Sequence, residues 1–262
     1  MPKAYEVIAD DLRRSIREGK RRPGDKLPSE TDLAGHYKRS VPTVQSALRV
    51  LNEEGLIDKQ HGRGNFVRRP RTMARRSNLR HQWEKSRARQ SVEERAQTGA
   101  TEHDTGLELE DLVFYASYRE IKADRDIAAV MGVPEGTALV ERTYRTRYAA
   151  ETAPFSLVTS YLVRDMVAEN PDLLDETKEP WPGGSQNQLY TVGIEVDRIE
   201  ERVTARPPTP EEAAELELPR GTSVLALRKT SYDVNDRVVD LSDIILPGDR
   251  TELLFTTSLE RW

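Results

Sequence analysis

The sequence predicts an α+β protein of two domains: a small, mainly helical one, then a larger one with a mostly antiparallel sheet. Its 262 residues exceed the roughly 250 at which a single hydrophobic core usually stops growing. Apolar residues follow helical spacing before residue 70 and strand-like alternation after residue 107. Charge also divides the chain, because residues 1–80 carry 19 basic and 10 acidic side chains, whereas the rest carry 21 and 35. We expect domains at 1–70 and 107–262, joined by a basic linker at 71–106.

Composition narrows the functional classes. The chain has no cysteine, and its four histidines show no metal-ligand spacing, so we expect no metal site and no cofactor. No apolar run approaches the ~20 residues of a membrane span, and the N-terminus does not resemble a signal peptide. We therefore expect a cytoplasmic protein with no membrane partner. The basic N-terminal part favours a polyanion as its partner.

Two helices are predicted first. Over residues 4–18, apolar side chains recur every three or four positions, and Gly19 follows as a stop signal. A turn-rich stretch with two prolines then leads to Ser29, which together with Asp32 resembles a capping box at the start of a second helix.

A third helix is predicted over residues 40–54. Ser40 is placed to cap it, Pro42 lies in its first turn, and Gly55 suits the left-handed residue after its end. Its apolar stripe faces inward, and its opposite face is polar. The segments LIDKQ and NFVRR, joined by HGRG, then predict a β-hairpin.

Helix, helix, turn, helix and hairpin within about 70 residues is typical of a winged helix-turn-helix domain. Its third helix lies in the major groove of double-stranded DNA, and the hairpin is the wing. A small helical domain that binds protein is the alternative, but the basic charge and the basic wing tip argue against it. The residues expected at the DNA are Thr31, Lys38, Arg39, Ser40, Pro42, Thr43, Gln45, Ser46, Arg49, His61, Gly62 and Arg63.

The segments PGDKLPSETDLA, TVQSALRVLNEEGLI and HGRGNFV resemble the DNA-binding domain of the GntR family of bacterial transcription regulators over about residues 4–69. The resemblance implies a palindromic operator with GT and AC outer bases. However, Thr31, Val41 and Gln45 stand where the family has arginines that contact guanine or phosphate, so the operator stays open. Gln45 suits adenine, and Lys38, Arg39 and Arg49 suit phosphates.

Residues 71–106 are first basic and poor in apolar residues, which suits a linker near DNA. A helix is possible at 81–97, with Trp83 as its one large apolar side chain. Partial disorder of this segment in the absence of DNA or effector is an open alternative.

The C-terminal part contains an internal duplication. The segment DRDIAAVMGVPEGTALVERTYRT returns 85 residues later as PEEAAELELPRGTSVLALRKTS, and each copy is followed by a second strand. A repeated helix-strand-strand unit predicts one mostly antiparallel sheet with two related halves and helices on one side. A crevice between such halves is a common place for a small-molecule pocket.

Four segments, VPEGTALVERTYRTRY, LYTVGIEVDRIEERVTA, LPRGTSVLALRKTSYD and PGDRTELLF, resemble the UTRA effector-binding domain of the HutC branch, whose fold is like that of chorismate lyase. The resemblance covers about residues 85–258 and implies a homodimer that binds a small-molecule effector. The effector is expected to be anionic, because the family's arginines on the strand after Pro134 hold anions. The segment KEPWPGGSQNQ either covers the pocket or is a surface loop. The expected pocket residues are Arg145, Arg147, Tyr161, Asp240 and Ser242.

The sequence therefore predicts a homodimeric, ligand-responsive transcription repressor that binds a palindromic operator. An enzyme acting on an aromatic acid rests on fold analogy alone, because no catalytic motif is present. A regulator whose C-terminal domain only dimerises or binds protein is a further alternative, because an acidic residue of the family's second strand is replaced here by Val158.

Overall fold

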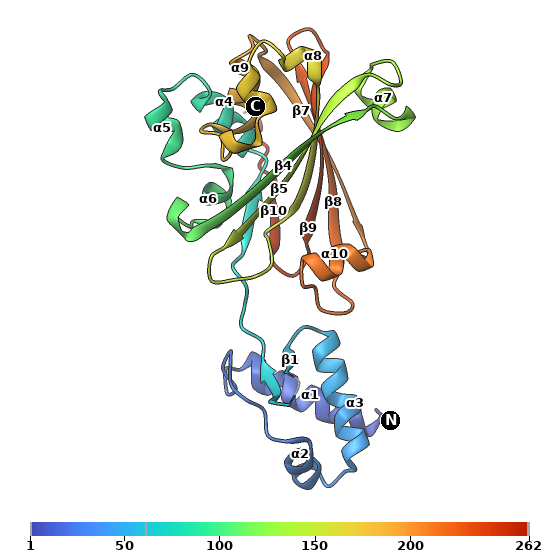
Figure 1. Ribbon diagram of the computed structural model, residues 1–262. Coiled ribbons are helices and arrows are strands. Elements are labelled where there is room, and N and C mark those ends of the chain that lie inside the picture. Colours follow the sequence, from blue (N-terminus) through green and yellow to red (C-terminus); the bar gives the residue numbers. More distant parts are fainter. Residues whose placement is uncertain (1, 61, 261–262) are drawn as a thin grey trace. The chain divides into compact units, whose positions relative to one another are not determined.

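The computed structural model describes residues 2–60 and 62–260, which form two compact units (Figure 1). One unit holds residues 1–71 and 217–222, and the other holds 72–216 and 223–262. The predicted fold class, an α+β protein with an N-terminal winged helix-turn-helix and a mostly antiparallel C-terminal sheet, is confirmed. None of the helices in the described part combines the length and the apolar character needed to cross a membrane.

Three helices form the N-terminal unit: α1 (Ala4–Arg17), α2 (Glu30–Tyr37) and α3 (Val41–Glu53). The capping box of α2 is present, since the Asp32 backbone N–H donates to Ser29 Oγ at 3.1 Å and the Ser29 N–H donates to the Asp32 carboxylate at 3.3 Å. Gly55 follows α3 with a φ of 71°, as expected for a left-handed helix end. Ser40 precedes α3, but its hydroxyl lies 2.9 Å from Thr43 Oγ1 and caps no backbone N–H.

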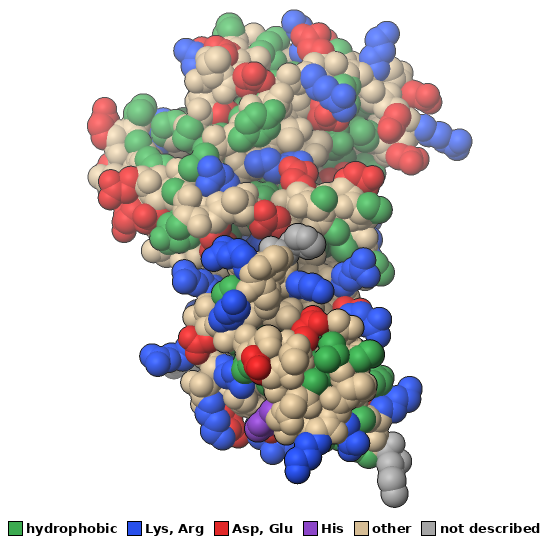
Figure 2. Space-filling view, turned by 60° about the horizontal axis from the view of Figure 1, so that its bottom comes forward, with side chains coloured by type: hydrophobic (Ala, Val, Ile, Leu, Met, Phe, Trp, Pro, Cys, Tyr) green, Lys and Arg blue, Asp and Glu red, His purple; other side chains and the backbone are tan. Residues whose placement is uncertain are grey.

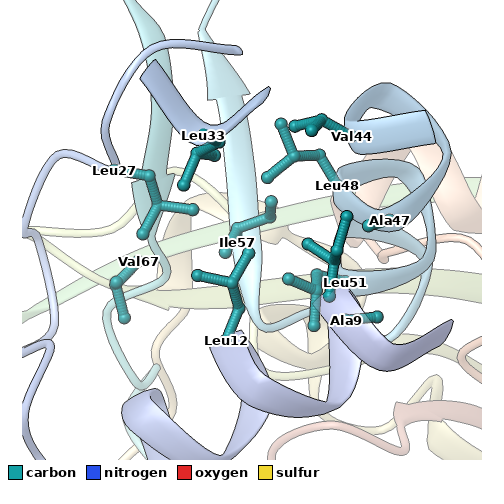
Figure 3. Packing of buried hydrophobic residues seen from close by; sticks show 11 residues of the cluster. Ala9, Leu12, Leu27, Leu33, Val44, Ala47, Leu48, Leu51, Ile57 and Val67 are labelled. Carbon is teal, nitrogen blue, oxygen red and sulfur yellow. The ribbon is translucent and has the colours of Figure 1, made fainter. Parts of the chain in front are cut away.

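The wing consists of β1 (Ile57–Gln60) and β2 (Gly64–Val67), an antiparallel pair in which Ile57 faces Val67. Wing and helices share one apolar core, in which side chains from α1, α2, α3 and both strands point toward one another (Figure 3). This core fixes the angle at which α3 presents its polar face. Its buried members are Ile8, Ala9, Leu12, Leu27, Leu33, Val44, Ala47, Leu48, Leu51, Ile57 and Val67.

A six-stranded antiparallel sheet organises the second unit, in the order β4-β5-β6-β9-β8-β7. The strands are β4 (Leu112–Lys122), β5 (Ala138–Tyr148), β6 (Leu157–Val163), β7 (Val196–Arg206), β8 (Val224–Asp233) and β9 (Val238–Pro247). The predicted duplication is visible in this order, because α7 (Arg125–Met131) precedes β5 and β6 while α10 (Pro210–Glu215) precedes β8 and β9. Figure 1 shows α7 and α10 at opposite ends of the sheet, as two halves related by a pseudo-twofold axis through β6 and β9 require.

Shorter elements complete this unit. They are α8 (Arg164–Val167), α9 (Gly184–Tyr190) and 3-10 turns at Leu109–Asp111, Pro171–Leu174 and Glu176–Lys178.

Residues 72–106 differ from the linker that the sequence suggests. They form β3 (Ala74–Ser77), α4 (Arg80–Arg87), α5 (Val92–Ala96) and α6 (Ala100–Thr105), and β3 pairs in parallel with β10 (Thr251–Leu254). Polar contacts hold this segment to the rest of the second unit. Buried Asn187 donates to the Ala88 carbonyl at 2.6 Å, and Gln186 donates to the His81 carbonyl at 2.8 Å. A search for apolar periodicity does not detect a segment anchored in this way.

Candidate functional site

The exposed face of α3 carries the side chains predicted to meet DNA. Arg49 and Gln45 are exposed, whereas Thr43 and Ser46 are half-buried. The Ser46 hydroxyl donates to the Pro42 carbonyl at 3.1 Å, and the Gln45 amide donates to the Glu30 carboxylate at 2.6 Å. The N-terminal half of this face is therefore neutral and already organised by hydrogen bonds.

Positive charge surrounds that neutral face. Lys38, Arg39 and Arg49 are exposed, and none of them pairs with a carboxylate among residues 2–60 and 62–260. Lys38 ends α2 in a left-handed conformation with a φ of 51°. In Figure 2, Lys and Arg side chains outnumber Asp and Glu over the N-terminal unit, which faces the viewer at the bottom of the picture. Such a surface suits the phosphates on either side of a groove.

The wing tip adds a second basic projection. Gly62 and Gly64 have φ values of 72° and 111°, which L side chains rarely adopt, so both positions favour glycine. Arg63 between them is exposed, with its guanidinium 5.7 Å from the Phe66 ring centroid. His61 lies outside the described residues. The other predicted DNA contacts, Thr31, Ser40 and Pro42, are exposed near the start of α2 or α3.

The second unit contains a cavity of about 550 Å³. Its floor is one face of the sheet, contributed by β5, β6, β8 and β9, and its wall is the segment from β3 to α6. The segment from Glu179 to Gln188 closes another side, so the loop whose role the sequence leaves open lines the cavity. This volume suits a small organic molecule.

Buried charge forms the floor. Arg142 and Asp240 are each 1% exposed, and the Arg142 guanidinium donates to Ser160 Oγ at 2.7 Å. Asp240 also accepts from Ser160 at 2.7 Å and from Ser242 at 3.2 Å, and Lys229 Nζ lies 3.0 Å from its second oxygen. Burial opposes the charge of Asp240, but Lys229 and Arg142 hold the pKa of its carboxyl below the ordinary value.

A second group of polar side chains adjoins this floor. Glu179 accepts hydrogen bonds from Tyr144 at 3.0 Å and from Gln188 at 2.8 Å, and Gln188 also accepts from Arg142 at 2.8 Å. The Tyr118 hydroxyl also donates to Glu179, and burial raises the pKa of Tyr118 to about 12. These tyrosines therefore stay protonated at neutral pH and act as hydrogen-bond donors.

The wall combines an aromatic side chain with arginines. The Trp83 ring centroid lies 4.4 Å from the Arg87 guanidinium and 4.4 Å from the His103 ring. Arg80 pairs with Asp104. Over the described part of the chain, five basic side chains lining the cavity (Arg76, Arg80, Arg87, Arg142 and Lys229) match five acidic ones (Glu84, Glu102, Asp104, Glu179 and Asp240).

Some donors in the cavity lining remain unused. The Nε atoms of Arg76, Arg80 and Arg142 are buried and have no acceptor among the described residues. A ligand with acceptor oxygens is chemically suited to such donors.

Comparison with known proteins shows the family. The family model for bacterial regulatory proteins of the gntR family matches residues 4–67, and the UTRA domain model matches residues 115–252. An uncharacterized HTH-type transcriptional regulator of Streptomyces coelicolor is 31% identical over 252 residues, covering 95% of this chain and 91% of the relative. This chain belongs to the GntR family.

A further relative and a solved structure resemble the chain over nearly its whole length. The histidine utilization repressor of Klebsiella aerogenes is 26% identical, covering 95% of this chain and 92% of its own. The crystal structure of PhnF from Mycobacterium smegmatis shares the fold, with a TM-score of 0.54 and 20% identity over 96% of this chain and 99% of that one. The chain is thus a transcriptional regulator of the GntR/HutC type with a UTRA domain, which confirms the expected regulator over the enzyme alternative.

The cavity of this GntR-family regulator contains only some of the predicted effector residues. Asp240 and Ser242 line it, whereas Arg145, Arg147 and Tyr161 do not. Arg145 points away and pairs with Glu215 at 2.5 Å, and Arg147 donates to the Glu151 carbonyl at 2.9 Å. Tyr161 packs against a separate apolar cluster near α7. These three predicted residues therefore do not belong to the lining of this cavity.

The alternate face of β5 lines the cavity through Arg142, Tyr144 and Thr146. The sequence pattern shows that side chains alternate between the two faces of this strand, but it does not show which of the two faces lines the cavity. Leu139 and Val140 are both buried, so the start of β5 is covered on both faces and the apolar pattern does not say which face continues into the cavity. The sequence also does not identify Lys229 and Glu179 as cavity residues, because their neighbours along the chain give no sign that Lys229 pairs with Asp240 or that Glu179 accepts from Tyr144.

Proposed function

We propose that this GntR-family regulator is a repressor that binds a palindromic operator as a homodimer and is released by an anionic small molecule. One observation carries the proposal: the segment from β3 to α6, which directly follows the DNA-binding unit in the chain, is also a wall of the cavity. An effector that prefers one position of this wall shifts the regulator toward that state, and only such differential affinity changes DNA binding.

On the DNA side, we propose that α3 lies in the major groove with Thr31, Pro42, Thr43, Gln45 and Ser46 near base edges. Pro42, Thr43, Gln45 and Ser46 lie in the N-terminal half of α3 and Thr31 lies at the start of α2, and none of the five is fully buried, which supports this assignment. Lys38, Arg39, Ser40 and Arg49 would contact phosphates, and His61, Gly62 and Arg63 would bring the wing to the minor groove. Two equivalent heads imply two inverted half-sites, bound to chromosomal DNA in the bacterial cytoplasm.

On the effector side, we propose that the anionic group meets Arg142 and Lys229 on the floor, beside Asp240 and Ser242. The unused donor atoms of the buried arginines support an anion. Equal numbers of basic and acidic side chains line the cavity. We therefore expect the part of the ligand outside its anionic group to be neutral, or to carry a positive charge that offsets the anionic group. Trp83 lines the cavity and adds apolar surface beside it.

The DNA part of the proposal is tested by selecting bound duplexes from a random pool and following the affinity of the best duplex against salt. A palindrome with a steep log–log salt slope is expected, because each neutralised phosphate releases counterions. Sedimentation of the complex gives the stoichiometry. Enrichment of one isolated half-site, or a single chain per duplex, contradicts the homodimer.

The effector part is tested by a thermal-shift screen of sugar phosphates and carboxylates, followed by operator release. A ligand at 100 times its dissociation constant stabilises by about 2.7 kcal/mol. Thr146→Phe fills the cavity from β5, and Thr143→Phe makes the same change on the opposite face of the strand. Only Thr146→Phe should abolish the shift and the release. If the two variants showed the same thermal shift and the same operator release, the effector would bind outside this cavity.

A further inference from the structure

One contact on the DNA-reading surface joins two helices. Gln45 Nε2 on α3 donates to Glu30 Oε2 on α2 at 2.6 Å. Both backbones are fixed, since Glu30 is the first residue of α2 after its capping box and Gln45 follows the fully buried Val44. The two helices also share the core through Leu33 and Leu48. The orientation of this exposed amide is therefore set by the fold before DNA arrives.

The contact leaves a defined pair of groups free. A glutamine amide has one acceptor oxygen and two N–H donors, and Glu30 uses one donor. One acceptor and one donor remain, which complement the N6 donor and N7 acceptor of adenine. Guanine presents two acceptors, N7 and O6, in the major groove and would need both donors. The Glu30 carboxylate thus biases Gln45 against guanine.

We propose that Glu30 is a positioning residue that makes Gln45 an adenine reader, so that each operator half-site has an A·T pair where arginine in this position would read guanine. The proposal rests on the proposed placement of α3 in the major groove. It deepens that function by naming the base and the residue that selects it.

The neighbours of Gln45 agree with this assignment. Val41, Pro42 and Thr43 are uncharged, and the segment from 41 to 46 contains no arginine that would contact guanine in a bidentate manner. The methyl groups of Val41 and Thr43 suit the thymine methyl group. Lys38, Arg39 and Arg49 supply charge around this surface without reading bases in it. The reading surface as a whole favours A·T pairs.

The test is selection of duplexes by the full-length protein, with four variants compared: wild type, Glu30→Ala, Gln45→Ala and the double variant. Gln45→Ala identifies the base position that Gln45 reads. At that position, the wild type should prefer adenine over guanine by about tenfold or more. Glu30→Ala should reduce this ratio to within about threefold, and should change nothing further in the Gln45→Ala background.

Loss of a negative charge raises affinity for every duplex, so the ratio of adenine to guanine duplexes is the readout, not affinity. Glu53→Ala is the matched control, because it removes a carboxylate from the other end of α3 and should leave the ratio unchanged. An unchanged ratio in Glu30→Ala, or guanine selected by the wild type at the Gln45 position, overturns the proposal while the operator proposal stands. A wild type that enriches no sequence overturns both.

Discussion

The N-terminal core and the cavity floor differ in the kind of side chain that each one buries. Among the described residues of the N-terminal unit, the buried side chains are apolar except for Asn65, and most polar side chains lie at the surface. The cavity floor instead buries Arg142, Ser160 and Asp240 inside the second unit. An apolar core holds a shape regardless of its surroundings, whereas a buried ion pair is stable only while each charge keeps its partners.

This difference assigns different tasks to the two units. The N-terminal unit presents a fixed surface whose exposed side chains, Gln45 among them, contribute little to the core. In the cavity, the groups that would bind a ligand are the same groups that stabilise the floor. A ligand there exchanges partners with the protein, so binding and stability are coupled in the second unit and nearly independent in the first.

The largest expected effect comes from Asp240→Asn, which leaves Arg142 and Lys229 without their shared carboxylate. We expect a loss of about 3–5 kcal/mol in the free energy of unfolding of the second unit, because a buried charge loses its partner. Trp83 and Trp181 belong to this unit, so tryptophan fluorescence follows its unfolding. Addition of Lys229→Met should restore part of the loss. An unchanged transition would contradict the role of buried charge.

Leu51→Ala tests the other interior. Leu51 is fully buried in the N-terminal core, and its truncation should cost about 3 kcal/mol through lost burial and a cavity. Circular dichroism should show early loss of helix, while the tryptophan transition stays in place. A shift of the tryptophan transition by the same amount would show that the two units unfold together.

A smaller effect is expected from pH. Burial alone would raise the pKa of Glu201, but His81, whose Nε2 lies 3.1 Å away, and Arg76 lower it to about 2. Because the folded pKa lies below the ordinary value near 4.5, this stabilisation is present above pH 4.5 and is lost as the pH falls toward 2. After allowance for solvent screening we expect about 2 kcal/mol. The unfolding temperature of Glu201→Gln should fall less steeply than that of the wild type as the pH is lowered from 4.5.

Arg49→Ala should give the smallest change. Arg49 is exposed, so its loss should leave stability intact and weaken binding to all duplexes about equally, with a salt slope lower by about one. Affinities for the selected operator and for a scrambled duplex, measured at several salt concentrations, check this. Loss of affinity for the operator alone would identify Arg49 as a base reader.

The two units also differ in what their sequence reveals. Caps and helix ends in the N-terminal unit depend on neighbours along the chain, so the sequence alone predicts the roles of Ser29, Asp32 and Gly55. The duplication predicts the sheet for a similar reason, because it is a pattern along the chain. The cavity depends on residues as far apart as Arg80 and Asp240, and on strand parity. Neighbours along the chain determine neither the contacts between such distant residues nor which face of a strand lines the cavity. The sequence therefore does not identify Arg142 as a cavity residue. It also suggests a linker for the segment that forms the cavity wall.

The pairing of β3 with β10 has a consequence for biosynthesis. Residues 74–77 can acquire their partner strand only after residues 251–254 have left the ribosome, whereas the N-terminal core is complete about 180 residues earlier. During translation the N-terminal unit can therefore fold long before the wall of the cavity is in place. A newly made chain acquires its N-terminal fold first and its closed cavity last.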